Sequence, residues 1–459
     1  MAKREKDWAA KRIEFIFAEI SRISPLLGAG GSARLREEAF FHTIKASSGN
    51  GSFPIGKQGG LAVEELANEA LNRNNLSGRA HNSEAKTFLK KHLASLMPVD
   101  TEPVSPDAAD KLLRDAGRAV AKKCTTRTHF FPVHITTDQR PARLDLGVIQ
   151  IHSKALLNER LCEVEPMLKK SNGSEADRDA DAKHLALIFD YYRSFNWVAE
   201  VTIDKCDRQT SRKLGAASVR TAMELLRLIV GRRHAYKFNA AAVQPENSNN
   251  YHFAFDADGN TFREWKGSSV TELSFNDEMA DVLCEPDEAF FMEKARAILP
   301  GAVMPNCDWP LTLRFFDALH WYGESIADKQ TAASFVKYML CIERLLMTDE
   351  RSDITNTLVE RAASLGMPPH LRSAESRENL REKTRRIYDL RSKIVHGAIS
   401  PNDPKIAAGI ADCGDLAEHL LKMYMVAFTS SEFTDPTYRP TRLAKWFDNL
   451  DTYLTSTYG

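Results

Sequence analysis

Two residues near the end of the sequence, Arg391 and His396, are of the types that cleave RNA without a metal ion. They lie five residues apart in the segment YDLRSKIVHG, which covers 388–397. Arginine is a permanent cation with a forked set of donors, and histidine exchanges a proton near neutral pH. In such a reaction the histidine moves the proton of the 2′-hydroxyl or of the leaving oxygen, while the arginine stabilises the charge on the phosphorane.

A predicted helix over about 376–396 must position both side chains. At about 100° per residue, six residues form an apolar arc roughly 140° wide, and Arg391 falls inside it. An arginine that faces a core is costly unless a partner or a cavity satisfies it. His396 lies about 140° from Arg391, and Gly397 is a typical residue at which a helix ends. The apolar arc consists of Leu380, Thr384, Ile387, Leu390, Ile394 and Val395.

The same helix is locally basic. Between His370 and His396 the sequence has eight lysines and arginines against four acids, a surplus of four positive charges that suits a phosphate backbone. We therefore expect RNA to contact side chains next to the pair, and we expect Glu343 and Tyr388 to support Arg391. The expected RNA contacts are Arg385, Arg386, Ser392 and Lys393.

A purely structural explanation stays open for each of these residues. An RxxxxH spacing arises by chance in many proteins, and a histidine at a helix end is usually a cap or is solvated. A run of mixed charges is more often a solvated helix face on which the charges partly compensate one another. A glutamate placed as Glu343 usually lies at the edge of a core and does not serve as a partner for an arginine.

Changes of composition along the chain predict an α+β multidomain protein. Residues 1–120 have the pattern of a mainly helical region, 121–300 that of an α+β domain, and 301–459 that of an all-α helical bundle. The strand-like stretches are 129–135, 144–151, 197–203, 251–259 and 268–275. The helices predicted in the last region are at about 309–326, 331–347, 353–364, 376–396 and 404–428.

The composition is that of a soluble globular protein, with 43% hydrophobic and 27% charged residues and a net charge of zero. Because the chain has no overall field, affinity for nucleic acid must come from a local patch. The seven cysteines are scattered and never form CxxC, which favours reduced thiols. No apolar run reaches the length of a membrane span, and the N-terminus lacks the apolar core of a signal peptide. We expect a cytoplasmic protein without membrane contacts.

No motif in the sequence predicts a cofactor or a metal ion. The segment GSFPIGK at 51–57 fits the first seven positions of a GxxxxGK[ST] phosphate-binding loop, but Gln58 replaces the hydroxyl that would hold magnesium. Pro54 also removes a backbone N–H that would bind phosphate, so a flexible loop is favoured here. His129 and His134 flank a predicted strand without the carboxylates or cysteines of a metal site.

The segment YDLRSKIVHG, preceded by FVKYMLCIERLL at 335–346, resembles the Apea-like HEPN family. The resemblance covers about 300–430, and WVAEVTIDKC at 197–206 is similar, less specifically, to the region before such domains in large members. HEPN domains are small helical bundles, and many are RNases in which an arginine and a histidine are spaced as Arg391 and His396 are. Many catalytic members carry Asn, Asp or His directly after the arginine, where this chain has Ser392.

The resemblance implies a metal-independent endoribonuclease that acts as a homodimer or a higher oligomer formed through the bundle. Arg391 and His396 of two chains would meet across a two-fold axis in one composite site, and cleavage would leave a 2′,3′-cyclic phosphate. Large prokaryotic members resemble antiviral or toxin-like effectors, so 121–300 would regulate the bundle by sensing a trigger ligand, a phage protein or an antitoxin. The alternative is a non-catalytic HEPN module that binds nucleotide, RNA or protein and serves as a dimerisation scaffold.

Overall fold

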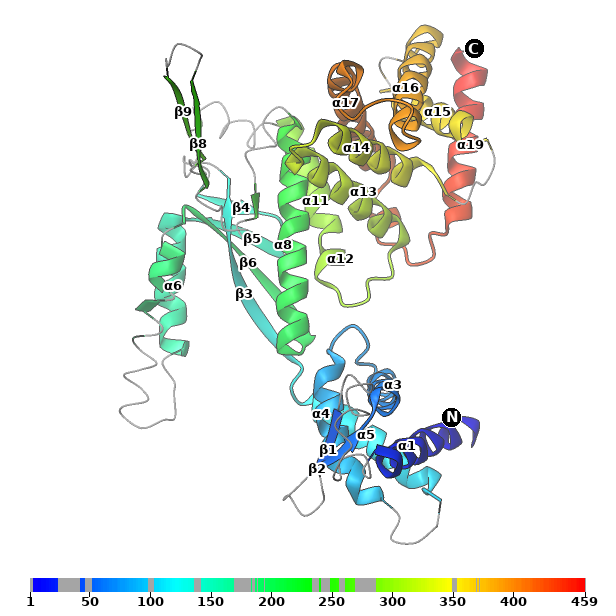
Figure 1. The fold of residues 1–459 in the computed structure, drawn as a ribbon. Helices are drawn as coiled ribbons and strands as arrows, with labels where there is room; N and C mark the ends of the chain where they lie inside the picture. Colours follow the sequence, from blue (N-terminus) through cyan, green and yellow to red (C-terminus); the bar gives the residue numbers. More distant parts are fainter. Residues whose placement is uncertain are drawn as a thin grey trace. The chain divides into compact units, whose positions relative to one another are not determined.

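The computed structural model is an α+β structure made mostly of helices, with three small sheets (Figure 1). Contacts divide the chain into two compact units. The first consists of Met1–Arg127 and Ile203–Leu214, and the second of Thr128–Thr202 and Gly215–Gly459. The structure describes residues 3–23, 42–45, 52–97, 103–135, 142–168, 183, 186–187, 189–193, 195–232, 239–240, 248–255, 261–268, 286–348, 353–368, 370 and 372–458.

The first unit is mainly helical, with its amphipathic helices packed around one apolar core. Ile13, Leu66 and Leu113 come from three of these helices and are completely buried. Next to this core a buried ion pair joins two helices, because Arg73 Nη1 lies 2.6 Å from Asp110 Oδ1. The elements of this part are α1 (Lys3–Ile23), β1 (His42–Lys45), β2 (Ser52–Ile55), α3 (Lys57–Arg73), α4 (Asn82–His92), η2 (Leu93–Leu96) and α5 (Pro106–Ala121).

The segment that partly fits a phosphate-binding loop forms a strand. β2 pairs antiparallel with β1, and α3 begins at Lys57, directly after its N-cap residue Gly56. The flexible loop that we expected over 51–57 is therefore wrong for 52–55, while residue 51 lies outside the described residues. The physical reason is the alternation of Phe53 and Ile55, which pack against the helical core.

A five-stranded sheet in the order β4-β5-β6-β3-β7 forms the middle of the chain. Helices cover its two faces. Successive side chains of a strand point to opposite sides, so neighbouring residues of one strand contact different helices. On β6, Glu200 bonds to Arg160 of α6, whereas Val201 meets Gly215 of α8. The elements are β3 (Thr125–His134), β4 (Arg143–Asp145), β5 (Ile149–Ser153), α6 (Lys154–Leu168), β6 (Trp197–Cys206), α8 (Arg208–Val230) and β7 (Asn239–Ala240).

The predicted strand at 144–151 is a hairpin. β4 and β5 pair antiparallel around a turn in which Gly147 has φ +77°, and Gly147 N donates to Asp145 Oδ1. A backbone with positive φ favours glycine, so this residue sets the position of the turn. A separate hairpin joins β8 (Ser248–Phe255) and β9 (Thr261–Ser268). Most of the strand predicted at 268–275 lies outside the described residues.

The C-terminal region is helical, and five of its helices agree with the predicted positions to within about two residues. Its core is rich in buried aromatic side chains, among them Phe315, Phe335, Tyr424 and Phe433. A further helix, α19, continues beyond the last predicted one. The helices are α11 (Pro286–Ile298), α12 (Pro300–Val303), α13 (Pro310–Ala327), α14 (Thr331–Leu346), α15 (Ile354–Leu365), α16 (Ala374–Val395), α17 (Pro404–Ala427), α18 (Ser430–Phe433) and α19 (Pro440–Tyr458).

Helix α8 of the sheet packs closely against α13 of the bundle. Arg227 Nη1 donates to the carbonyl of Gly323 at 3.2 Å. A Cβ atom on Gly323 would lie 2.7 Å from Cγ of Glu224, so glycine permits this close approach. The sheet and the bundle therefore belong to the same compact unit, and the boundary predicted at residue 300 lies inside it.

Candidate functional site

Helix α16 carries both candidate catalytic residues and has a well-defined start and end. Its N-cap residue is Ser373, and its C-cap residue is His396. Gly397 follows with φ +69°, and Ala398 N donates to the carbonyl of Lys393 at 2.8 Å. These are the features of a Schellman motif, in which a left-handed glycine lets the chain turn back over the last carbonyls. The helix therefore ends where the sequence predicts, with His396 at its tip.

Arg391 is held by a carboxylate from the neighbouring helix α14. Its Nε lies 3.2 Å from Oε1 of Glu343, and its Nη2 donates to Oε2 at 3.4 Å. Both side chains are about four-fifths buried, with exposed fractions of 21% and 20%. The guanidinium also lies 5.8 Å from the ring centre of Tyr388, one turn earlier on α16. The structure thus brings together three of the residues that the sequence singled out.

The ion pair between Arg391 and Glu343 is an imperfect one. Among the described residues, Nε of Arg391 and Oε1 of Glu343 are buried without a hydrogen-bond partner, although they are close to each other. Burial raises the pKa of Glu343, and the attraction of Arg391 does not offset this effect. Only one long hydrogen bond joins the two groups. An oxyanion that accepts two hydrogen bonds can therefore compete with Glu343 for the guanidinium.

His396 is exposed at the end of α16. Its backbone N donates to the carbonyl of Ser392 at 3.0 Å, and within the described part of the chain no hydrogen bond or ion pair involves its imidazole. Val395, which lies in the apolar arc, is 49% exposed, so the arc is not buried along its whole length. The helical wheel gives the direction of a side chain but not how far the neighbouring helices extend. The last turn of α16 consequently presents both an imidazole and an apolar side chain to solvent.

A second arginine lies in the same arc and was missed by the sequence reasoning. Arg377 is only 3% exposed, and its guanidinium is paired with Asp451 of α19. Its Nη1 also donates to Thr455 Oγ1 at 2.8 Å, and Glu360 of α15 lies 3.5 Å away. An arginine on the inner face of α16 can therefore be purely structural when carboxylates satisfy it. The signal that could have identified it is its angular position, about 40° from Arg391.

Two of the four predicted RNA contacts are already neutralised. Arg386 Nη2 lies 2.7 Å from Asp412 Oδ2 on α17, and Lys393 Nζ lies 2.6 Å from Asp389 Oδ2 one turn earlier. Both cations are more than half exposed, so each pair is weak. The surplus of positive charge counted along the sequence is thus partly compensated by acids, one of them on α17.

The other two predicted contacts lie on the same side of α16 as the imidazole. At about 100° per residue, Arg385, Ser392 and His396 fall within roughly 40° of one another. Arg385 is exposed and Ser392 is partly exposed. No hydrogen bond or ion pair of the Arg385 side chain occurs among the residues that the structure describes. The three side chains form one polar stripe that a nucleic acid backbone could follow.

Close packing of α17 holds the second half of α16 in place. A Cβ atom at Gly409 would lie 2.9 Å from Cδ2 of Leu390 and 3.4 Å from Cε2 of Phe335 on α14. The absence of a side chain at Gly409 lets α17 approach the residue directly before Arg391. The position of the guanidinium is therefore set by three helices together.

The described residues contain no group of three His, Cys, Asp or Glu side chains arranged to hold a metal ion. None of the helices in the described ranges has an apolar stretch of the length that a membrane crossing requires. No protein-family model, no curated protein and no solved structure matches this chain.

Proposed function

We propose that this chain is a metal-independent endoribonuclease of the HEPN type, with Arg391 and His396 as its catalytic pair. The observation that carries this proposal is the end of α16, where an exposed imidazole at the C-cap accompanies a guanidinium with a weakly held counterion. The residues before the bundle would regulate it in response to a trigger, as in an antiviral or toxin-like effector. Two copies of the chain would complete one site.

The proposed reaction uses only groups of this chain. His396 accepts the proton of the 2′-hydroxyl, the 2′-oxygen attacks the adjacent phosphorus, and the bond to the 5′-oxygen breaks. The leaving oxygen takes a proton from an imidazolium, so the products are a 2′,3′-cyclic phosphate and a 5′-hydroxyl. Arg391 releases Glu343 and donates to the phosphorane oxygens as negative charge develops there. Arg385 and Ser392 bind a flanking phosphate.

Cleavage of total cellular RNA in excess EDTA tests this proposal. We expect the wild-type chain to cut RNA, and we expect His396→Ala and Arg391→Ala each to lower the rate by at least about 100-fold. His370→Ala is the matched control, because it removes another exposed histidine of the bundle. Equal rates for His396→Ala and the control would overturn the catalytic role of His396. End analysis of the products distinguishes a cyclic phosphate from a simple hydrolysis product.

Adjacent arginines provide a test of the RNA-binding stripe. Arg385→Gln and Arg386→Gln each remove one positive charge, but only Arg385 lies on the same side of α16 as His396, whereas Arg386 is paired with Asp412. The logarithm of the binding constant for single-stranded RNA falls linearly with the logarithm of the salt concentration. We expect Arg385→Gln to reduce the magnitude of this slope by about 0.7, the contribution of one phosphate contact. Arg386→Gln should leave the slope nearly unchanged. The reverse order would place the RNA on another face of the helix.

A non-catalytic dimerisation scaffold is the second candidate, and the exposed Val395 supports it. This apolar side chain is 49% exposed at a helix end and is accessible to another copy of the chain. The structural role of Arg377 also shows that an arginine on this face needs no substrate. If this candidate is right, Val395→Asp converts dimers to monomers in light scattering. Ile354→Asp, at another exposed aliphatic residue, leaves the dimers intact, and the wild-type chain cuts no RNA. Cleavage by the wild type would exclude this candidate.

A further inference from the structure

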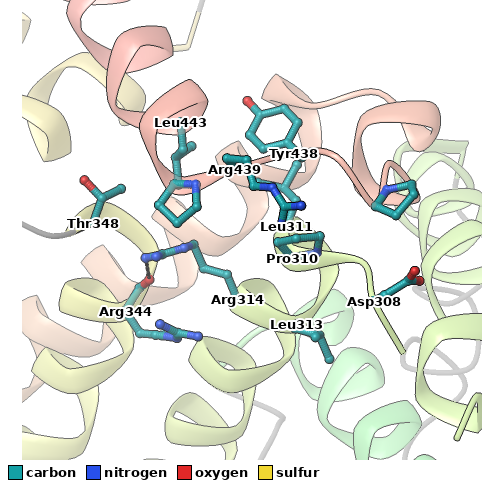
Figure 2. A pocket seen from close by; sticks show the side chains of 12 residues that line it. Asp308, Pro310, Leu311, Leu313, Arg314, Arg344, Thr348, Tyr438, Arg439 and Leu443 are labelled. Atoms are coloured by element: carbon teal, nitrogen blue, oxygen red, sulfur yellow. Dashed lines mark hydrogen bonds between the residues drawn. The ribbon is translucent and has the colours of Figure 1, made fainter. Parts of the chain in front are cut away.

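A cavity of about 590 Å³ lies in the C-terminal bundle, lined by residues that the catalytic proposal does not use (Figure 2). Three segments that are distant in sequence surround it: the start of α13, the end of α14, and the turn that leads into α19. At about 30 Å³ per water molecule, the cavity has room for on the order of twenty waters. Its size falls within the usual range for a small-molecule site.

Three arginines from these three segments line the cavity. Figure 2 shows Arg314, Arg344 and Arg439 around one space, with Asp308 on the side away from Arg344. Asp308 is the one acid among the lining residues, so the lining carries a net charge of +2, three cations less one anion. Arg344 is paired with Asp317 outside the lining, so the site favours an anionic ligand, most strongly one that displaces this carboxylate.

Arg314 forms a rigid part of this lining. Its side chain is nearly buried, and its Nη1 donates to the carbonyl of Arg344 at 2.7 Å and to that of Met347, at the end of α14. These bonds fix the guanidinium before any ligand arrives. A positive group that is already in place costs little conformational entropy on binding.

The other two arginines are available to a ligand. Arg344 places Nε and Nη2 on a single oxygen of Asp317, at 3.0 and 2.7 Å, and this exposed pair contributes little and is readily exchanged. Arg439 is exposed, and its guanidinium has no hydrogen bond or ion pair within the described ranges. It is the residue directly before α19, where the positive end of the helix dipole adds to its charge.

The remaining lining suits an organic group attached to the anion. Leu313 contributes exposed apolar surface, together with three prolines of the same segments, and Leu311 and Leu443 lie almost completely buried beneath it. A lone oxyanion would leave this surface and most of the volume to water. A phosphate ester has about −1.5 to −2 charge and three acceptor oxygens, which match several arginines better than one carboxylate does.

We propose that this cavity binds a small organic phosphate, with Arg439 and Arg344 on the phosphate and Leu313 and the prolines against its organic part. The site is separate from Arg391 and His396, so it does not depend on RNA cleavage. Binding of AMP and of glucose 6-phosphate to the full chain, measured by calorimetry beside adenosine and glucose, tests this. We expect both phosphates to bind and to raise the melting temperature, and neither parent compound to do so.

A matched pair of variants on one helix end makes the test specific. Arg439→Gln and Lys445→Gln each remove one exposed positive charge, but Lys445 does not line the cavity. We expect Arg439→Gln to weaken AMP binding at least about tenfold, the loss of one charge-assisted hydrogen bond, and Lys445→Gln to leave it unchanged. Arg314 is not a suitable target, because its bonds to the end of α14 contribute to the fold.

Several results would overturn the proposal. These are equal binding of a phosphate and its parent compound, no binding of either phosphate at millimolar concentration, or equal effects of Arg439→Gln and Lys445→Gln. The same titration of His396→Ala should give the wild-type affinity. This arm separates the two proposals, because a chain that cuts no RNA can still bind AMP, and the converse also holds.

Discussion

The ion pair between Arg391 and Glu343 allows a quantitative test of the candidate site through the stability of the fold. At 3.2 Å and an effective dielectric constant of about 20, two unit charges attract by about 5 kcal/mol. Burial raises the pKa of Glu343 despite this attraction, so the cost of removing the carboxylate from water exceeds the stabilisation that Arg391 provides. Only one long hydrogen bond joins the two groups and each side chain is about one-fifth exposed, so solvent screens the attraction and we expect a coupling of only about 1–2 kcal/mol in a double-mutant cycle.

The two single substitutions should have unequal effects. Arg391→Gln leaves a mostly buried carboxylate without its countercharge, which should lower the free energy of unfolding by about 2 kcal/mol. Glu343→Gln keeps the shape and an acceptor oxygen, and the guanidinium that remains has Tyr388 beside it. This change also removes the Glu343 carboxylate, whose burial is unfavourable, so we expect the free energy of unfolding to fall by no more than about 0.5 kcal/mol.

The pH dependence has a defined sign. The pKa of Glu343 in the fold is above its ordinary value of 4.5. Its contribution to stability is therefore complete below that ordinary value and is lost as the pH rises through the raised pKa. In Arg391→Gln the deficit should shrink as the pH is lowered, because the isolated carboxylate becomes protonated. In Glu343→Gln this dependence should disappear.

Urea unfolding followed by tryptophan fluorescence measures the cycle at pH 7 and near the ordinary pKa of a glutamate. A shift of the midpoint at constant m-value reports stability alone. The reasoning would be refuted by a coupling below about 0.5 kcal/mol, the scatter of independent sites. A larger loss for Glu343→Gln than for Arg391→Gln would refute it as well, since burial would then not be the dominant effect on the carboxylate.

Further expected effects lie at glycines and at a carboxylate of the sheet. Gly397→Ala should lower the free energy of unfolding by about 1 kcal/mol in a thermal melt, because φ is +69° while a new Cβ meets no described atom within 4 Å; a loss above about 3 kcal/mol would contradict this. Gly323→Ala should cost about 1–3 kcal/mol, since its Cβ would clash with Glu224, and a neutral result would mean looser packing of α8 on α13. Glu200 has a pKa lowered to about 2, first by the hydrogen bond with His152, so it contributes stability above 4.5 that is lost as the pH falls toward 2. Glu200→Gln should flatten this acid branch by about 3 kcal/mol, and an unchanged branch would show that other groups cause it.

Helix positions in the bundle follow from local signals that the sequence contains. The period of the apolar residues and the helix-ending Gly397 predict α16 almost to the residue, and Pro404 marks the first turn of α17. These signals act within one or two turns, so they do not depend on the rest of the fold. The strand at 52–55 shows the limit of such reasoning. The sequence pattern there indicates a loop, but Ile55 is buried in a core whose other residues are distant in sequence, and this burial stabilises a strand.

The depth of a side chain is a different matter from its direction. Val395 and Arg377 both lie on the arc of Arg391, yet one is half exposed and the other is almost completely buried. The difference depends on where α15 and α19 end beside α16, which the sequence of α16 does not contain. Likewise, Asp412 on α17 neutralises Arg386, so a local count of charges overstated the positive surface.

The sequence alone determined that this chain carries an arginine and a histidine of the types that metal-independent RNA cleavage uses, and that one helix presents both. Only the tertiary structure decided that Glu343 holds the arginine loosely while the histidine faces solvent. It alone also assembled Arg314, Arg344 and Arg439 around one cavity. The physical reason is that residue type and helical period are local properties, whereas a counterion or a cavity exists only where separate segments meet.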